Sequence, residues 1–275
     1  MSDPSSDQPR DPISRFARDT AVEAVGPGRY RGSIDRGWWI ERGPNGGYVA
    51  ALVLRAITAE VADPERHPRS LTLHYLRPPA EGAVDVDVVV EREGRSLSSV
   101  TARLSQDGLL CAVAVAALSV DRQGVVLRDE SMPVVPPPED IAPPPADRPT
   151  IPLTARYDMR WAIGDPPFTG GTEARAGGWI RLAEPDVVDA HLLVALADAW
   201  VPPIFSKVAE PLAVPTVDLT VHLLDEPHPA EEWVLVEFAT RWAGAGFLEE
   251  DGRLWSRDGR LLAQARQLAA VLTFG

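Results

Sequence analysis

The spacing of apolar residues predicts a chain of antiparallel strands interrupted by buried helices. Residues 48–62 are apolar around most of a helical circumference, as in a core helix, and Asp63-Pro64 ends that segment. Short β-type runs precede it at 30–34 and 38–40. Alternating apolar and polar positions then predict four strands, at 70–76, 83–91, 96–105 and 109–120. The last two form a hairpin across the favoured turn dipeptide Asp107-Gly108.

A second buried helix is expected around residues 192–200, and it carries one carboxylate, Asp198. Its neighbours are apolar or small on all sides, and burial disfavours the charged form of a carboxylate. Asp198 therefore either reaches solvent or an arginine at the end of the helix, or belongs to a functional site.

The same order of elements occurs twice. Leu71-Thr72-Leu73-His74 is answered by Leu219-Thr220-Val221-His222, and Asp107-Gly108 by Asp258-Gly259. Gly178-Trp179-Ile180 likewise echoes Gly37-Trp38-Trp39. Such matches, in the same order, indicate an internal duplication.

A proline-rich segment separates the two copies. Residues 133–152 contain nine prolines in twenty and are expected to form a semi-rigid linker. The expected organisation is a loose N-terminal arm (1–22), an N-terminal half (23–132), this linker (133–152) and a C-terminal half (153–275).

Composition restricts the function. The formal net charge of −13 argues against nucleic-acid binding, which requires clustered Lys and Arg. No apolar run reaches the ~20 residues needed to span a bilayer, and the polar N-terminus does not resemble a secretory signal. The single cysteine, Cys111, precludes an internal disulfide and fits a reducing, cytoplasmic location. The histidines do not cluster with acids at metal-ligand spacing, so neither a metal nor another cofactor is expected.

The duplicated pattern resembles the TesB-like acyl-CoA thioesterases over roughly residues 25–275. The segments that carry the resemblance are Asn45-Gly46-Gly47-Tyr48-Val49, Ser70 to Pro78, Glu93-Gly94-Arg95-Ser96, Ala197-Asp198, Pro215-Thr216-Val217-Asp218, and Asp258-Gly259 leading to Gln267. The resemblance implies an α+β fold, the double hotdog: two fused halves, each a long helix wrapped by an antiparallel sheet. It also implies hydrolysis of an acyl-CoA to a fatty acid and CoA, with the site between the halves.

The resemblance assigns the catalytic water to three side chains, Asp198, Thr216 and Gln267. Strand alternation independently places Gln267 as the one polar member of an apolar face, where an amide needs partners. Alternation places Thr216 on the less apolar face, unless a bulge at Pro215 resets the phase. Asp198 would act either as general base or as nucleophile.

The glycines indicate a composite site. Aligning Gly47 with Ala190 places Asp198 opposite Arg55. Simple hotdog thioesterases that pair as dimers carry the glycine pair and the acid on the same subunit, and each of their sites takes one of these from each partner. Here Gly46 and Gly47 lie in the half without the acid, and the acid lies in the half without the glycines. The resemblance therefore implies that one composite site survives and the other has degenerated. The resemblance makes Gly46 and Gly47 substrate-binding residues, and the Gly47 N–H could polarise the thioester carbonyl. The alternative for this glycine pair is a tight turn with close helix packing.

Two other functions compete with hydrolysis. A hotdog hydratase acting on enoyl-CoA would require an Asp and a His close together after a strand, with a Gly-Asp-x-Asn-type loop, and Gly164-Asp165-Pro166-Pro167 does not supply the His. His191, seven residues before Asp198, could form a dyad with it, but an exposed residue in the first turn of the helix explains His191 better. A non-catalytic acyl-CoA-binding protein would share the fold. Because the sheets have exposed edges, a homodimer of double hotdogs is also expected.

Overall fold

The computed structural model describes residues 14–145, 151–228 and 232–273. The N-terminal half contains six strands, β1 (Glu23–Gly26), β2 (Arg29–Ile34), β3 (His67–Tyr75), β4 (Gly82–Glu93), β5 (Leu97–Gln106) and β6 (Leu109–Ser119). The C-terminal half contains β7 (Tyr157–Ile163), β8 (Arg175–Leu182), β9 (Leu212–Ala213), β10 (Thr216–Leu223), β11 (Val234–Ala239), β12 (Ala243–Gly244), β13 (Phe247–Trp255), β14 (Leu261–Ala270) and β15 (Leu272–Thr273).

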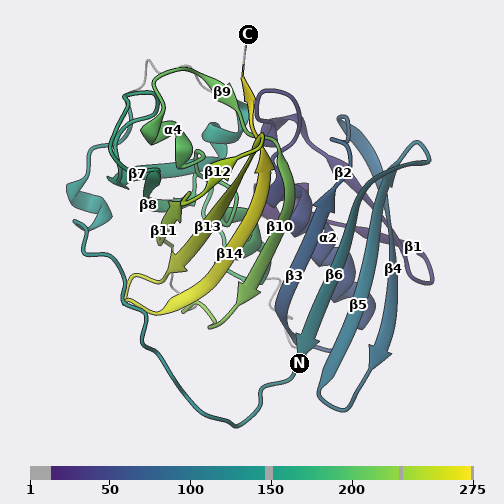
Figure 1. The fold of residues 1–275 in the computed structure, drawn as a ribbon. Helices are drawn as coiled ribbons and strands as arrows, with labels where there is room; N and C mark the ends of the chain where they lie inside the picture. Colours follow the sequence, from purple (N-terminus) through teal and green to yellow (C-terminus); the bar gives the residue numbers. More distant parts are fainter. Residues whose placement is uncertain (1–13, 146–150, 229–231, 274–275) are drawn as a thin grey trace, which may run out of the picture.

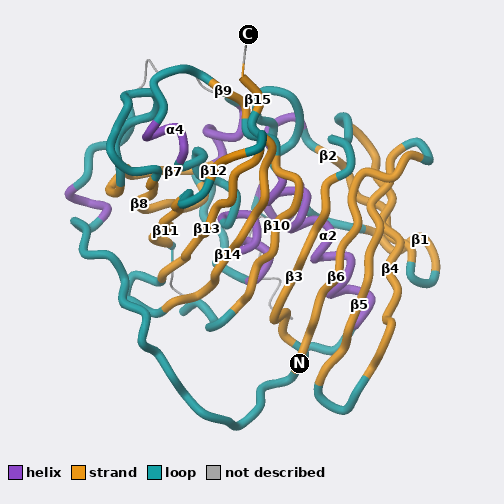
Figure 2. Tube along the Cα trace, in the orientation of Figure 1, coloured by secondary structure: helices purple, strands orange, loops and turns teal. Residues whose placement is uncertain are grey.

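Within the described residues the helices are fewer than the strands, and all except α2 are short. The α-helices are α1 (Arg15–Asp19), α2 (Gly46–Val61), α3 (Ala190–Leu196) and α4 (Ile204–Lys207). Three 3₁₀ turns accompany them, η1 (Arg36–Trp38), η2 (Pro138–Asp140) and η3 (Pro152–Arg156). Figure 2 shows the helices, in purple, beside a sheet that makes up most of the molecule.

One 13-stranded antiparallel sheet runs through both halves, in the order β1-β2-β4-β5-β6-β3-β10-β14-β13-β11-β8-β7 along its main path. Corresponding strands of the two halves occupy corresponding places in the sheet: outward from the centre the order is β3-β6-β5-β4-β2-β1 in one half and β10-β14-β13-β11-β8-β7 in the other. Thr72 and Thr220 face each other across that pair, with their hydroxyl oxygens 3.0 Å apart and 148 positions between them in the chain. Residues that correspond in the two sequence repeats are therefore related by a pseudo-two-fold axis at the middle of the sheet.

The helix α2 forms where the pattern predicts it. Asn45 caps its N-terminus by accepting a hydrogen bond from the Tyr48 N–H, and Ala62 ends it in a left-handed conformation just before Pro64. Its sides are buried against β2, β3, β4 and β5. Figure 1 shows these strands curving around α2. α2 also packs against α3, and one core encloses both helices.

Three local expectations are wrong. The arm expected to be loose forms a helix at Arg15–Asp19, because the Phe16 side chain, 2% exposed, packs on Trp38; residues 1–13 lie outside the described residues. The β-type run at 38–40 is instead the end of η1 and an isolated bridge. Gly37-Trp38-Trp39 is therefore not the structural equivalent of Gly178-Trp179-Ile180, which lies within β8.

The proline-rich segment follows the outer surface of the C-terminal half. Its described residues 133–145 include the 3₁₀ turn η2, which begins at Pro138, a position that tolerates proline. Val135 and Ile141 pack on a small outer cluster that includes Trp179 and Trp255. The segment therefore covers an apolar patch on the outer face of the C-terminal sheet.

Candidate active site

Asp198 lies in the turn after α3, not within a helix as the sequence suggested. The helix ends at Leu196 because the chain turns tightly there: the Asp198 N–H donates to the Ala195 carbonyl, a three-residue spacing. This turn directs the carboxylate at the N-terminus of α2. Asp198 Oδ2 accepts hydrogen bonds from the Gly47 N–H at 2.9 Å and from Asn45 Nδ2 at 3.0 Å.

The two glycines allow this close approach. A Cβ on Gly47 would lie 2.5 Å from the Ala195 carbonyl oxygen, and a Cβ on Gly46 would lie 2.9 Å from Asp198 Oδ2. Only residues without side chains therefore permit the start of α2 to meet the end of α3 and the carboxylate that follows it. The close helix packing considered as the alternative for these glycines is present, and their role in substrate binding stays a prediction.

Burial raises the pKa of Asp198 to about 6. Hydrogen bonds from the peptides of Gly47 and Gly46, and from the amides of Gln267 and Asn45, favour the charged form and oppose this rise. Asp198 nevertheless keeps part of its surface accessible. The result is a carboxylate that is ionised near neutral pH, yet is a stronger base than an ordinary aspartate.

Gln267 and Thr216 meet beside Asp198. Gln267 points inward from β14 and is 7% exposed, as strand alternation predicts. Its Oε1 accepts a hydrogen bond of 3.0 Å from Thr216 Oγ1, and its amide also binds Asp198. Thr216 reaches this point because the register of β10 shifts between Thr216 and Asp218, the bulge considered for Pro215. The structure thus brings together all three residues assigned to the water.

Further residues of this site were not singled out from the sequence. Tyr75 donates a 2.8 Å hydrogen bond to the Gly46 carbonyl, and Asp198 is close enough for its charge to raise the pKa of Tyr157. Glu250 on β13 accepts a 2.8 Å hydrogen bond from Gln267 Nε2. Asn45 appeared in a matched motif, but only the structure shows its amide on Asp198. Inward alternation on β13 was the one available signal for Glu250.

The Gly47 N–H is not free in this structure. The sequence suggested that it would polarise a substrate carbonyl, but here it donates to Asp198. The reason is electrostatic: two peptide N–H groups at a helix N-terminus attract the nearest carboxylate. Asp198 therefore occupies the donors that an oxyanion would need.

The pseudo-symmetric position carries different chemistry. There, Asp189 caps α3 as Asn45 caps α2. Against the effect of burial, the hydrogen bond and charge of His191 and the Leu192 N–H lower the pKa of Asp189, and the charge of Arg55 adds a smaller effect in the same direction. The Arg55 side chain donates to Thr20 at 2.7 Å. His191 pairs with Asp189 at 2.9 Å and makes no described contact with Asp198. An arginine thus stands where the other site has its acid.

No group of three or more His, Cys, Asp and Glu residues that could hold a metal ion occurs in the described part of the chain. Across these same ranges, no helix is long and apolar enough to cross a membrane.

Family models match both halves of the sequence. The acyl-CoA thioesterase N-terminal domain matches residues 35–119, and the acyl-CoA thioesterase C-terminal domain matches residues 137–271. The chain belongs to the acyl-CoA thioesterase family. This membership confirms the family inferred from the sequence motifs.

Solved structures support the fold of this thioesterase-family chain. A hot dog fold protein of unknown function from Alicyclobacillus acidocaldarius is 28% identical, with a TM-score of 0.85 over 94% of this chain and 98% of that one. Acyl-CoA thioesterase II TesB2 from Mycobacterium marinum is 21% identical, with a TM-score of 0.76 over 94% and 99% of the two chains. The α+β double hotdog predicted from the sequence is thus confirmed.

A curated relative matches part of the sequence. Thioesterase-like protein TwmA of Talaromyces wortmannii is 32% identical over 113 residues, which are 40% of this chain and 32% of that protein. The match therefore spans less than a third of the relative's length.

Proposed function

We propose that the chain hydrolyses acyl-CoA thioesters to a free acid and CoA, with Asp198 activating the water and Thr216 and Gln267 orienting it. One observation carries this proposal. Three side chains from distant parts of the sequence meet at the N-terminus of α2. Thr216 donates a hydrogen bond to Gln267, Gln267 lies close enough to Asp198 to favour its charged form, and Asp198 accepts the Gly47 N–H. The family supplies the substrate class.

As general base, Asp198 takes a proton from water while the water oxygen attacks the thioester carbonyl carbon. The tetrahedral intermediate then expels the thiolate by breaking the C–S bond, and the thiolate takes the proton back from Asp198. As nucleophile, Asp198 would instead attack the thioester carbonyl carbon and expel the CoA thiolate by breaking the C–S bond, and water would then hydrolyse the resulting mixed anhydride to the free acid and the regenerated carboxylate. Both routes require an ionised Asp198 with a raised pKa, so both fit the site.

The peptide N–H donors of α2 can change acceptor during this reaction, from the Asp198 carboxylate to the substrate oxyanion. In the free site, the Gly47 N–H stabilises the Asp198 carboxylate. When Asp198 becomes protonated its negative charge is lost, while an oxyanion develops on the substrate. The Gly47 N–H is then available to the oxyanion, and the role proposed for this glycine from the sequence applies at that stage.

A thiol-release assay across acyl-CoA substrates from acetyl to palmitoyl tests this proposal. Release of CoA above the uncatalysed rate is the expected result. Tight binding without turnover would support the non-catalytic acyl-CoA-binding protein, and hydration of enoyl-CoA without thiol release would support the hydratase. The same acyl groups carried by an acyl carrier protein show which donor the site accepts.

A further inference from the structure

Glu250 is a buried carboxylic acid on an apolar surface. It is 5% exposed, and its inward-facing neighbours on β13 are apolar or small: Leu248, Gly252 and Leu254. Its Oε2 is buried, with no hydrogen-bond partner within the described residues. Burying a carboxyl group with an unsatisfied oxygen destabilises the folded state, and a Leu would fill the same position without that cost. Packing alone therefore does not account for Glu250.

The contact that Glu250 does make is with the proposed water-orienting residue. Glu250 and Gln267 are opposite one another in the ladder between β13 and β14. Glu250 Oε1 accepts a hydrogen bond of 2.8 Å from Gln267 Nε2. The amide of Gln267 has two N–H donors, and Asp198 is also bound by this amide. The Gln267 amide is thus hydrogen-bonded to Glu250 and lies close enough to Asp198 to lower the pKa of that carboxyl group.

The orientation of this amide matters. With Nε2 toward the carboxyl groups, Oε1 faces Thr216 and accepts its hydroxyl proton at 3.0 Å. A flipped amide would place its oxygen against acceptor oxygens of Glu250 and Asp198, and leave Thr216 facing an N–H. We propose that Glu250 is a positioning residue that acts through Gln267, holding this amide in the orientation that serves both Thr216 and Asp198.

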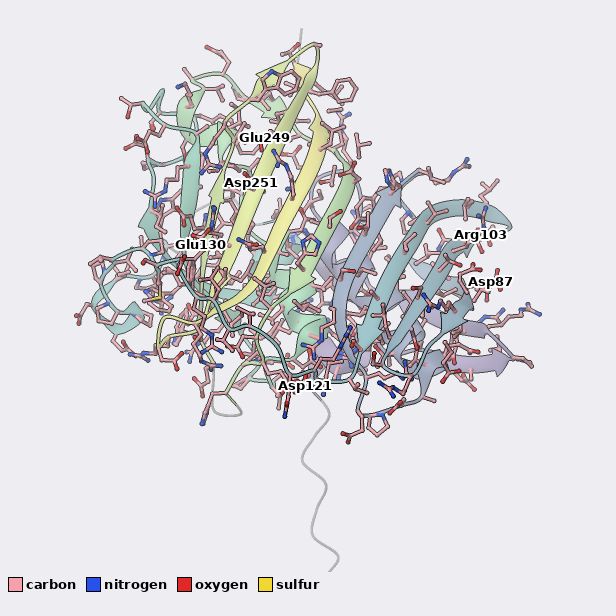
Figure 3. All side chains as sticks on the ribbon, turned by 60° about the horizontal axis from the view of Figure 1, so that its bottom comes forward. Asp87, Arg103, Asp121, Glu130, Glu249 and Asp251 are labelled. Carbon is pink, nitrogen blue, oxygen red and sulfur yellow. The ribbon has the colours of Figure 1, made fainter. Side chains whose placement is uncertain are left out.

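The charges around Glu250 show why an acid can do this without disturbing Asp198. Burial raises the pKa of Glu250 to about 8, opposed by the hydrogen bond from Gln267, which lowers it, and aided by the charges of Asp198, Glu249 and Asp251. Glu249 and Asp251 lie on the outer face (Figure 3), where they pair with Arg266, and Asp251 also with Arg241. Glu250 is thus neutral near neutral pH. It accepts a hydrogen bond through its carbonyl oxygen and adds no second negative charge beside Asp198.

Two substitutions at this position separate positioning from other roles. Glu250→Leu removes the acceptor, and Glu250→Gln keeps an amide oxygen in the same place. We expect Glu250→Leu to lower kcat roughly ten-fold with KM unchanged, because the Gln267 amide is free to rotate. Glu250→Gln is expected to restore kcat to within about three-fold of wild type. Asp87→Asn, which removes an exposed charge from β4 in the N-terminal half, is the control and should change neither constant.

The inference rests on the proposed thioesterase function, and the assay distinguishes their failures. Absence of thiol release by the wild type, or full activity of Asp198→Asn, defeats the proposed function. An inactive Asp198→Asn together with wild-type turnover by Glu250→Leu defeats only the role of Glu250. A loss in Glu250→Gln as large as in Glu250→Leu also overturns it. If Glu250→Leu and Glu250→Met both fail to fold, the residue is structural and the proposal is wrong.

Discussion

At the scale of single residues, the sequence indicated the site through residue types rather than contacts. Asp198, Thr216 and Gln267 came from a family resemblance, and alternation supported only Gln267. The side of the sheet that Thr216 faces depends on a bulge in β10 between Thr216 and Asp218. At this bulge, Asp218 Oδ1 accepts a hydrogen bond from the Leu268 N–H. The alternation of apolar and polar residues along a strand cannot predict such a contact. Glu250 escaped notice because Glu249, Glu250 and Asp251 together resemble a solvated run of acids.

The raised pKa of Asp198 predicts the pH dependence of turnover. Only the ionised carboxylate can accept a proton or attack a carbonyl, so kcat/KM should rise as pH increases through about 6 and level off above that value. A pH series of kcat/KM on a saturable acyl-CoA measures this. A single inflection near the ordinary aspartate pKa of ~3.9 would contradict the burial that the structure shows.

The hydroxyl of Thr216 is expected to contribute modestly. Thr216→Ala should lower kcat about five-fold, because a neutral hydrogen bond contributes ~1 kcal/mol. Gln267→Ala should cost more, since Gln267 contacts both Thr216 and Asp198. Steady-state kinetics with Thr216→Ser as the control tests the hydroxyl directly. A serine variant as slow as the alanine variant would show that the methyl group, not the hydroxyl, matters.

At the scale of elements, long periodic segments were predictable and short ones were not. The α2 helix and strands β3, β4, β5 and β6 follow their patterns closely. The segment around Asp198 was apolar enough for a longer helix, but α3 stops at Leu196, and the following turn delivers the carboxylate to α2. The helix α1 escaped detection because one aromatic residue, Phe16, anchors it.

The contact between α2 and the end of α3 gives an element-scale prediction. Gly47→Ala places a Cβ 2.5 Å from the Ala195 carbonyl, so the two elements must separate. We expect a loss of about 1–3 kcal/mol in unfolding free energy and a large loss of turnover. Gly26→Ala is the matched control, because a Cβ there meets nothing within 4 Å. Denaturant midpoints measure the effect; equal stability of both variants would refute the close contact.

At the scale of the whole molecule, duplication explains both the fold and the single site. The halves join through β3 and β10 into one sheet, which was not apparent from the sequence, because pairing between halves leaves no local pattern. Each half contributes a different part: α2 supplies the peptide donors and the segment after α3 supplies the acid. At the pseudo-equivalent place, Arg55 acts on Asp189.

Assembly is a prediction at this scale. The sheet ends in the edge strands β1 and β7, whose unpaired backbone groups favour association. We therefore expect a homodimer, with twice the chain mass of 29.8 kDa. Light scattering at micromolar concentration measures it, and a mass equal to that of one chain would exclude the dimer.

The central claim is that the chain has one active site and that its activity depends on Asp198. The decisive measurement compares thiol release by Asp198→Asn and Arg55→Ala with that of the wild type. The amide fills the same space but can act neither as base nor as nucleophile, so turnover by Asp198→Asn should fall by ~10²–10⁴ or more. Arg55→Ala should stay within about five-fold of wild type, because it alters only the degenerate position. Near-normal turnover by Asp198→Asn, or an equal loss in Arg55→Ala, would contradict the account.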